Sequence, residues 1–114
     1  MAFQVRAVTK YVGVSPQKVR LVVNQVRGMT AVEALNALKF MMQAAAKPVE
    51  KTLRSAVANA EENFGLNRSD LFISQIFADE APTRKWRRFG ARGRFKPILK
   101  RASHITVILE EREA

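Results

Sequence analysis

Residues 71–109 read LFISQIFADEAPTRKWRRFGARGRFKPILKRASHITVIL, and this stretch contains two strand patterns on either side of a basic segment. Its beginning, Leu71–Ala78, is rich in Ile and Phe, and near its end Ile105, Val107 and Leu109 alternate with other side chains. Both patterns are typical of strands. If the two strands pair in an antiparallel manner, the residues between them form a long hairpin that projects from the sheet. Each arm of about nine residues, at ~3.3 Å per residue, would reach about 30 Å.

The segment between these strands carries nearly all of the net charge. Residues 83–101 hold nine basic residues and no acidic one, whereas the whole chain has 20 basic and 10 acidic residues and a formal net charge of +10. A localised excess of this kind points to a polyanionic partner, nucleic acid first and an anionic membrane surface second. The nine basic residues are Arg84, Lys85, Arg87, Arg88, Arg92, Arg94, Lys96, Lys100 and Arg101.

Aromatic residues and glycines are interleaved with these cations. Trp86, Phe89 and Phe95 can stack on unpaired bases, or they can fold back onto the domain as a small satellite core. Gly90 and Gly93 permit a tight tip or a close approach of the main chain to phosphate. Because nine like charges repel across a hairpin with few apolar side chains, we expect the arm to order fully only against RNA.

Residues upstream of this stretch predict one strand and three helices. Phe3–Val12 alternates weakly and ends at Gly13, which indicates an edge strand. Ser15 and Pro16 are a typical N-cap and first helical residue, and the valine stripe that follows ends at Gly28. That stripe consists of Val19, Val22, Val23 and Val26.

The second and third helices have equally local signals. Thr30 and Glu33 form a capping box that opens a short helix through Leu35 and Leu38. A longer helix is predicted from about Met42 to Asn63 and ends at Gly65; because Pro48 falls near its first turns, either a slightly later start or a kink is possible. Its predicted buried face comprises Val49, Leu53, Ala56, Val57, Ala60 and Phe64.

Together these elements predict the α+β class, with three helices packed on a small three-stranded antiparallel sheet and an extended basic β-hairpin. A chain of 114 residues has no room for a second core, and 47% hydrophobic residues suffice for one. We therefore expect a single domain over residues 1–114, with residues 83–101 as a hairpin arm within it.

Composition argues against several classes of protein. The absence of cysteine excludes disulfides and thiol chemistry, and a single His leaves no metal-ligand set. The acidic pairs Glu61-Glu62, Asp79-Glu80 and Glu110-Glu111 are sequence neighbours and do not resemble a catalytic dyad across a cleft. No apolar run approaches the roughly 18 residues that span a bilayer, and the N-terminus lacks signal-peptide order. We expect an intracellular, soluble binding protein without cofactor or metal, and not an enzyme.

The first helix offers a second candidate contact surface. Gln17, Arg20, Asn24 and Arg27 fall on one stripe away from the valines, and Lys18 lies at the helix start, where backbone N–H groups favour phosphate. This stripe is either a nucleic-acid contact or an ordinary polar face. The same two interpretations apply to a third patch near the N-terminus, formed by Arg6, Lys10 and Tyr11.

Several stretches resemble the bacterial-type large ribosomal subunit protein twenty-two family, in order and at the family's spacing. They are SPQKVR at 15–20, SAVANAE at 55–61, DEAP at 79–82, ARGR at 91–94 and KRASHI at 100–105. The resemblance covers nearly the whole chain.

The resemblance implies a structural protein that binds 23S-type rRNA, supports subunit assembly and lines the nascent-peptide exit tunnel with its hairpin. The implied partners are this rRNA, neighbouring large-subunit proteins and the nascent polypeptide, and the implied location is cytoplasmic, in the ribosome. We expect the free protein to be monomeric. The predicted rRNA-binding residues are Lys18, Arg20, Arg84, Lys85, Trp86, Arg87, Arg88, Arg92, Gly93, Arg94, Lys96, Lys100 and Arg101.

Two other functions compete with this one. A free-standing nucleic-acid-binding protein, such as an RNA chaperone or a nucleoid protein, would need the same charge distribution. A cationic membrane-surface protein is disfavoured because the basic segment has no amphipathic helical stripe.

Overall fold

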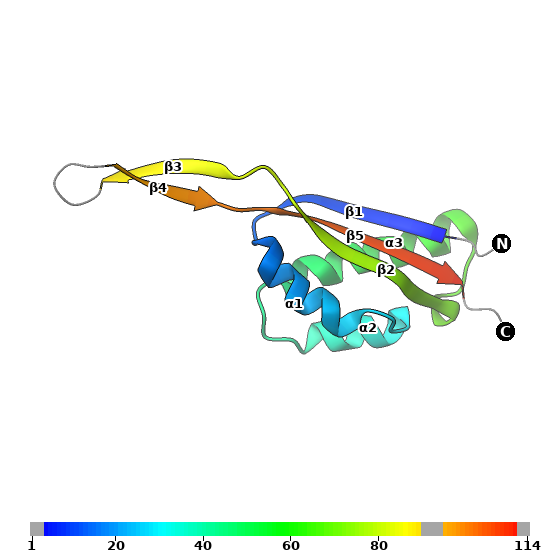
Figure 1. The fold of residues 1–114 in the computed structure, drawn as a ribbon. Helices are drawn as coiled ribbons and strands as arrows, with labels where there is room; N and C mark the ends of the chain where they lie inside the picture. The colour runs from blue at the N-terminus through cyan, green and yellow to red at the C-terminus, as the bar shows by residue number, and fades with distance from the viewer. Residues whose placement is uncertain (1–3, 90–94, 112–114) are drawn as a thin grey trace.

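Strands β1, β5 and β2 form one antiparallel sheet, and β3 and β4 form a separate two-stranded ladder beyond it (Figure 1). The computed structural model describes residues 4–89 and 95–111, and over residues 84–89 and 95–99 it describes the backbone. Within these residues the chain forms three α-helices and five strands, so the predicted α+β class is confirmed. The elements are β1 Gln4–Val12, α1 Pro16–Val26, α2 Ala31–Lys39, α3 Ala46–Phe64, the 3-10 helix η1 Arg68–Asp70, β2 Leu71–Glu80, β3 Arg84–Phe89, β4 Phe95–Lys100 and β5 Ser103–Glu111.

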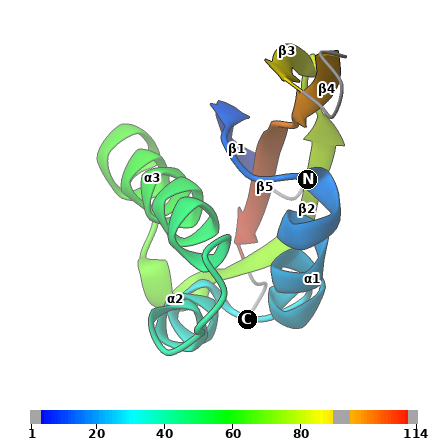
Figure 2. The ribbon, with the colours of Figure 1, turned by 90° about the vertical axis from the view of Figure 1, so that its left-hand side faces the viewer.

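The central strand of the sheet is the last one in the sequence. β5 pairs with β1 on one side and with β2 on the other, both antiparallel, so β1 is an edge strand as predicted. Alternation along β5 places Ile105, Val107 and Leu109 in the core, where each is fully buried. The three helices cover this face of the sheet (Figures 1 and 2).

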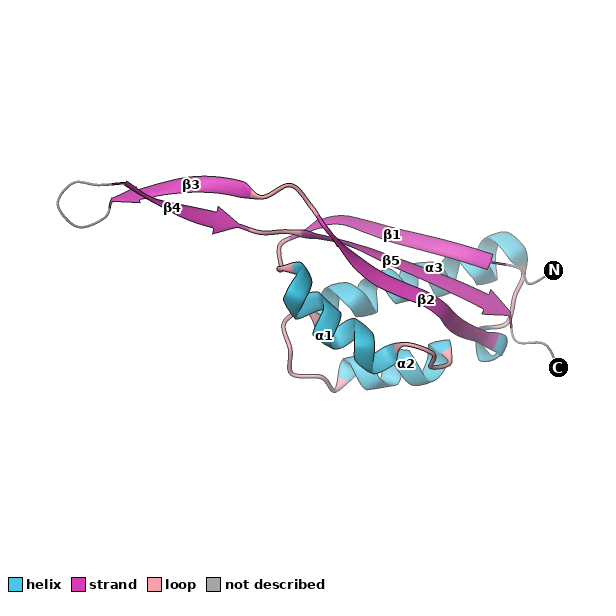
Figure 3. Cartoon of the chain, viewed as in Figure 1, coloured by secondary structure: helices cyan, strands magenta, loops and turns pink. Residues whose placement is uncertain are grey.

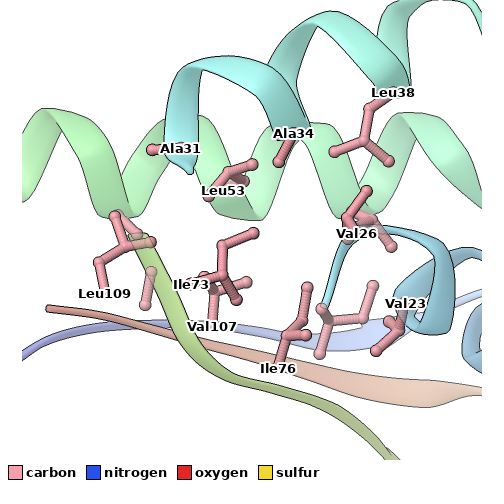
Figure 4. Packing of buried hydrophobic residues seen from close by; sticks show 14 of the residues in the cluster. Val23, Val26, Ala31, Ala34, Leu38, Leu53, Ile73, Ile76, Val107 and Leu109 are labelled. Atoms are coloured by element: carbon pink, nitrogen blue, oxygen red, sulfur yellow. The ribbon is translucent and has the colours of Figure 1, made fainter. Parts of the chain in front are cut away.

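The helices bury the apolar stripes that their sequences predict. The four valines of α1 are fully buried, and α2 contributes Ala31, Ala34 and Leu38 to the same cluster. Figure 4 shows Val23 and Val26 of α1 and the three α2 side chains converging with Leu53 of α3 and with Ile73 and Val107 of the sheet. One buried cluster thus joins all three helices to the sheet.

Helix α3 takes the later start that Pro48 suggested, and one residue of its predicted buried face is exposed. It begins at Ala46 rather than near Met42, so Pro48 lies in the first turn, where the backbone N–H groups have no helical partner and the missing N–H of proline costs nothing. The prediction that Phe64 is buried is wrong, because its side chain is 49% exposed at the last turn of the helix. Gly65 ends the helix in the left-handed conformation, at φ 65°.

The hairpin projects from the sheet as predicted (Figure 3). Its backbone ladder pairs Arg84 with Lys100 at the base and Phe89 with Phe95 at the far end. Ala81 N donates to Ala102 O at 3.0 Å, so the two arms of the hairpin are also paired between the sheet and the ladder. The molecule is 67 Å long but only 25 Å and 19 Å across, because the hairpin extends it along one direction.

Candidate nucleic-acid interface

Two adjoining hollows lie where the hairpin leaves the sheet, and we call them together the basal cleft. The larger, of about 420 Å³, is lined by Gly13, Val14, Ser15, Lys18, Ala44, Lys100 and Arg101. The smaller, of about 230 Å³, is lined by Tyr11, Gly13, Pro82, Lys100, Arg101 and Ala102. They share Gly13, Lys100 and Arg101. These shared residues are neighbours because the turn from β1 to α1 lies at the end of the sheet from which the hairpin departs (Figure 1).

The basal cleft brings together three of the predicted rRNA-binding residues. Lys18 comes from the first turn of α1, whereas Lys100 and Arg101 come from the returning arm of the hairpin, and all three are exposed. Arg101 Nη1 lies 3.8 Å from Glu80 Oε1, and both side chains are largely exposed, so this ion pair is weak. The cleft is therefore a concave surface with a predominance of positive charge.

The N-terminus of α1 adds to this positive potential. Its first turn has no acidic residue, and the Ser15 hydroxyl makes no capping hydrogen bond although Ser15 occupies the N-cap position. The positive end of the helix dipole at this position favours an anion. Together with the three cations, it makes the larger hollow suited to a phosphate group.

A buried hydrogen bond holds the two walls of the basal cleft together. Ser103, the first residue of β5, is fully buried and donates from its hydroxyl to Val14 O at 2.6 Å. Val14 N in turn donates to Val12 O at 2.8 Å, which tightens the turn between β1 and α1. Lys18 is thereby placed by the first turn of α1, and Arg101 by the two-residue connection between β4 and β5 that Ser103 anchors.

The exposed stripe of α1 has a structural role that its spacing does not reveal. Arg20 donates from Nε and Nη2 to Ala78 O at 3.2 and 3.1 Å, and Arg27 donates from Nη2 to Ile76 O at 2.9 Å. Both carbonyls lie on the edge of β2 that faces away from β5. The same edge is bonded earlier in the strand, where Ile73 N donates to Met29 O at 2.9 Å. The two arginines thus satisfy an edge that would otherwise be open to another strand.

The remaining predicted contacts lie on the hairpin. The backbone register pairs Arg84 with Lys100 and Arg88 with Lys96, so basic residues are register partners at two positions of the ladder. Lys85, Trp86 and Arg87 belong to β3 in the same ladder. The predicted contacts Arg92, Gly93 and Arg94 lie outside the described residues.

Tyr11, which the sequence offered only as part of a third patch with Arg6 and Lys10, lines the smaller hollow and contacts His104. The pairing of β1 with β5 is irregular between Thr9 and Val12, and Tyr11 there has a positive φ of 57°. Its backbone N donates to His104 Nδ1 at 3.1 Å, and the two rings meet nearly perpendicularly with centroids 4.9 Å apart. Strand alternation would place Tyr11 on the core face, whereas the bulge turns it outward and buries Val12 instead. No local sequence signal marks this bulge.

The described residues contain neither a metal-ligand cluster nor a membrane-spanning helix. Over residues 4–89 and 95–111, no three His, Cys, Asp or Glu side chains come close enough together to hold a metal ion. In that part of the chain, no helix combines the length and the apolar character needed to cross a bilayer.

Comparisons with known proteins find one family, matched over nearly the whole length of the chain. The family model described as Ribosomal protein L22p/L17e matches residues 7–110. The chain is 52% identical over 110 residues to the large ribosomal subunit protein uL22 of Finegoldia magna, covering 96% of this chain and 98% of that protein. It is 53% identical over 108 residues to the uL22 protein of Dehalococcoides mccartyi strain 195, covering 95% and 99%, respectively. With the uL22 protein of Synechococcus sp. strain JA-3-3Ab the identity is 54% over 104 residues, covering 91% and 85%.

Proposed function

Since this chain belongs to the ribosomal protein L22p/L17e family, we propose that it binds large-subunit rRNA through the basal cleft and the projecting hairpin. It is a structural, non-enzymatic protein of the large ribosomal subunit. Its place in the cell is the ribosome, which agrees with the predicted cytoplasmic location.

The observation that carries this proposal is the convergence of cations at the base of the hairpin. Lys18, Lys100 and Arg101 lie in one cleft although the first is more than eighty positions from the others in the sequence. The hairpin continues this surface away from the domain with a further run of basic residues and no acidic one. Contacts of this kind neutralise phosphates and release counterions, so they set affinity and register rather than base preference.

The shape supports a more specific role for the hairpin. A two-stranded ladder that projects from a packed domain can enter a narrow space between RNA segments while the domain stays outside. We infer that the hairpin lies along the nascent-peptide exit tunnel, lines it with its tip and so contacts the nascent polypeptide. The domain contacts 23S-type rRNA and neighbouring large-subunit proteins during assembly, and the free protein is a monomer.

The salt dependence of rRNA binding tests the electrostatic mechanism. Six to nine phosphate contacts, at about −0.7 to −0.9 each, predict that a plot of log K against log salt concentration has a slope of about −4 to −8. The measurement is a titration of a large-subunit rRNA transcript with the full chain at several KCl concentrations and constant magnesium. A slope near zero would contradict binding through phosphates.

Sedimentation of a cell lysate tests the ribosomal location independently. On a sucrose gradient, the protein is expected in the fractions that contain large-subunit particles. Accumulation in the free fraction, without large-subunit particles, would instead indicate a free-standing RNA chaperone or nucleoid protein.

A further inference from the structure

Tyr11 is held in a conformation that a tyrosine adopts only when its surroundings enforce it. Its φ of 57° lies in the left-handed region, which is unfavourable for residues with a Cβ, and 66% of its surface is exposed. An exposed aromatic ring gains little from burial that could offset this strain. Backbone strain of this kind is concentrated at binding sites.

Two contacts fix the direction of the Tyr11 ring. The bulge between Thr9 and Val12 turns the residue out of the sheet, and the bond from Tyr11 N to His104 Nδ1 holds its backbone in place. The His104 ring meets the Tyr11 ring edge-on, at 89° between the planes, so it covers at most one face of the phenol ring. The Tyr11 ring is therefore orientated by its neighbours and remains accessible.

The surroundings of this ring suit a nucleotide. Tyr11 lines the smaller hollow of the basal cleft together with Pro82, Lys100 and Arg101, and the larger hollow adjoins it through Lys100 and Arg101. An aromatic face offers a stacking platform for a nucleobase, and cations beside it hold the attached phosphate. Both requirements are met within one concave surface.

We propose that the basal cleft is a nucleotide subsite in which an unpaired rRNA base stacks on Tyr11 while Lys100 and Arg101 hold its phosphate. This inference rests on the proposed function, since the nucleotide belongs to the rRNA that the hairpin binds. It adds a contact to the base itself, which phosphate neutralisation alone does not supply. His104 acts as a positioning residue, because it orientates Tyr11 without itself belonging to the hollow.

A pair of substitutions separates stacking from general apolar contact. Tyr11→Phe keeps the aromatic face and Tyr11→Leu removes it, while both keep a Cβ in the same strained backbone. We expect the affinity for a large-subunit rRNA transcript at fixed salt to fall about tenfold in Tyr11→Leu, and to stay within about twofold of the parent protein in Tyr11→Phe. Equal affinities for the two variants would overturn the proposal.

The salt slope distinguishes this result from a failure of the proposed function. Tyr11→Leu should leave the slope unchanged, whereas Arg101→Gln should reduce its magnitude by about 0.7 to 0.9. If the parent protein itself does not bind the transcript, the proposed function fails. If the parent protein binds and Tyr11→Leu binds equally well, only the stacking subsite fails.

A third variant excludes a merely structural role for Tyr11. Glycine adopts a positive φ without strain, so Tyr11→Gly should keep or raise the unfolding midpoint while it weakens rRNA binding as Tyr11→Leu does. A Tyr11 that served only to pack against His104 would give the opposite result, with lower stability and unchanged affinity.

Photo-cross-linking identifies the contact directly. A transcript that carries 5-iodouridine should cross-link to the stacked aromatic ring on irradiation. Trypsin, which cleaves after Lys10 and after Lys18, would then release the modified peptide Tyr11–Lys18. Mass spectrometry is expected to find the nucleotide on this peptide in the parent protein and not in Tyr11→Leu. Since only modified uridines react, further transcripts with 6-thioguanosine, 5-iodocytidine and 8-azidoadenosine cover the other three bases. Cross-links confined to other peptides with all four probes would overturn the proposal.

Discussion

At the level of single residues, the cations of α1 divide into two groups with different roles. Arg20 and Arg27 bind carbonyl groups on the outer edge of β2, whereas Lys18 lines the basal cleft. Two residues of the predicted stripe thus brace the sheet, whereas Lys18, outside the stripe, belongs to the proposed rRNA surface. The proposal makes these roles separable, because a brace affects unfolding and an rRNA contact affects binding.

Substituting one residue from each group should separate these roles. Arg27→Ala removes a charge-assisted bond to Ile76 O and should lower the free energy of unfolding by about 1 kcal/mol. Lys18→Ala should leave the free energy of unfolding within about 0.5 kcal/mol and weaken rRNA binding. Urea denaturation and rRNA titration of both variants provide the measurements. A Lys18→Ala protein that binds rRNA normally would remove Lys18 from the interface.

The hydroxyl of Ser103 connects stability to the geometry of the basal cleft. Ser103→Ala leaves Val14 O without this donor in a buried position and should cost about 1–2 kcal/mol of unfolding free energy. The exposed Ser55 on α3 is the matched control, because Ser55→Ala there should be neutral or slightly stabilising. Guanidinium denaturation of both variants compares them. Equal midpoints would show that the bond to Val14 contributes nothing measurable.

At the level of elements, the helices are placed by the face that each buries rather than by their intrinsic propensity. Helix α3 lies across β1 and β5, and Leu53 at its centre is fully buried among side chains of the sheet and the other helices (Figure 4). The hydroxyl of Thr52, the residue before it, bonds both Pro48 O and the Thr9 hydroxyl, which ties α3 to β1. Packing of this kind supplies most helical stability in a folded protein.

The same substitution at two leucines tests this view. Leu53→Ala should lower the free energy of unfolding by about 2–5 kcal/mol because it opens a cavity in the core. Leu21→Ala, on the outward face of α1 with 60% exposure, should change it by less than about 1 kcal/mol. Thermal and urea unfolding of both variants provide the comparison. Similar losses at both positions would contradict the assignment of the core.

At the level of the whole molecule, the hairpin forms a sheet of its own. The ladder of β3 and β4 is distinct from the three-stranded sheet β1-β5-β2, whose buried residues form the core with the helices. We infer that residues 1–114 form one domain whose arm, residues 83–101, depends on the core for its position while the core does not depend on the arm.

Removing the arm should therefore leave a folded domain. Deletion of residues 85–96 brings Arg84 next to Pro97 and leaves a short loop before Lys100, the partner of Arg84 in the register. We expect cooperative unfolding with a midpoint within a few degrees of the parent protein, and a salt slope of rRNA binding that is several units smaller in magnitude. Circular dichroism melts and titrations give both quantities. Loss of cooperative unfolding would show that the arm belongs to the core.

Much of this architecture could be predicted because its signals are local. Of the predicted Thr30–Glu33 capping box, one bond is formed, in which the Thr30 hydroxyl accepts from Glu33 N. Gly65 ends α3 at the predicted position. The alternating apolar residues of β5 face the core. Phe64 shows the limit of such patterns, since helical spacing extends the predicted buried face one turn beyond Ala60, the last buried residue of α3.

By itself, the sequence determined the helices, the strands and the concentration of positive charge in one segment between two strands. These depend on side-chain periodicity, capping residues and composition, which act over a few neighbouring positions. Only the tertiary structure decided that Lys18 joins Lys100 and Arg101, that Arg20 and Arg27 bind the β2 edge, and that Tyr11 turns outward. These three arrangements depend on the register of β1 and β2 against β5 and on how α1 packs on the sheet. Contacts between residues far apart in the sequence are set by such packing and not by local preference.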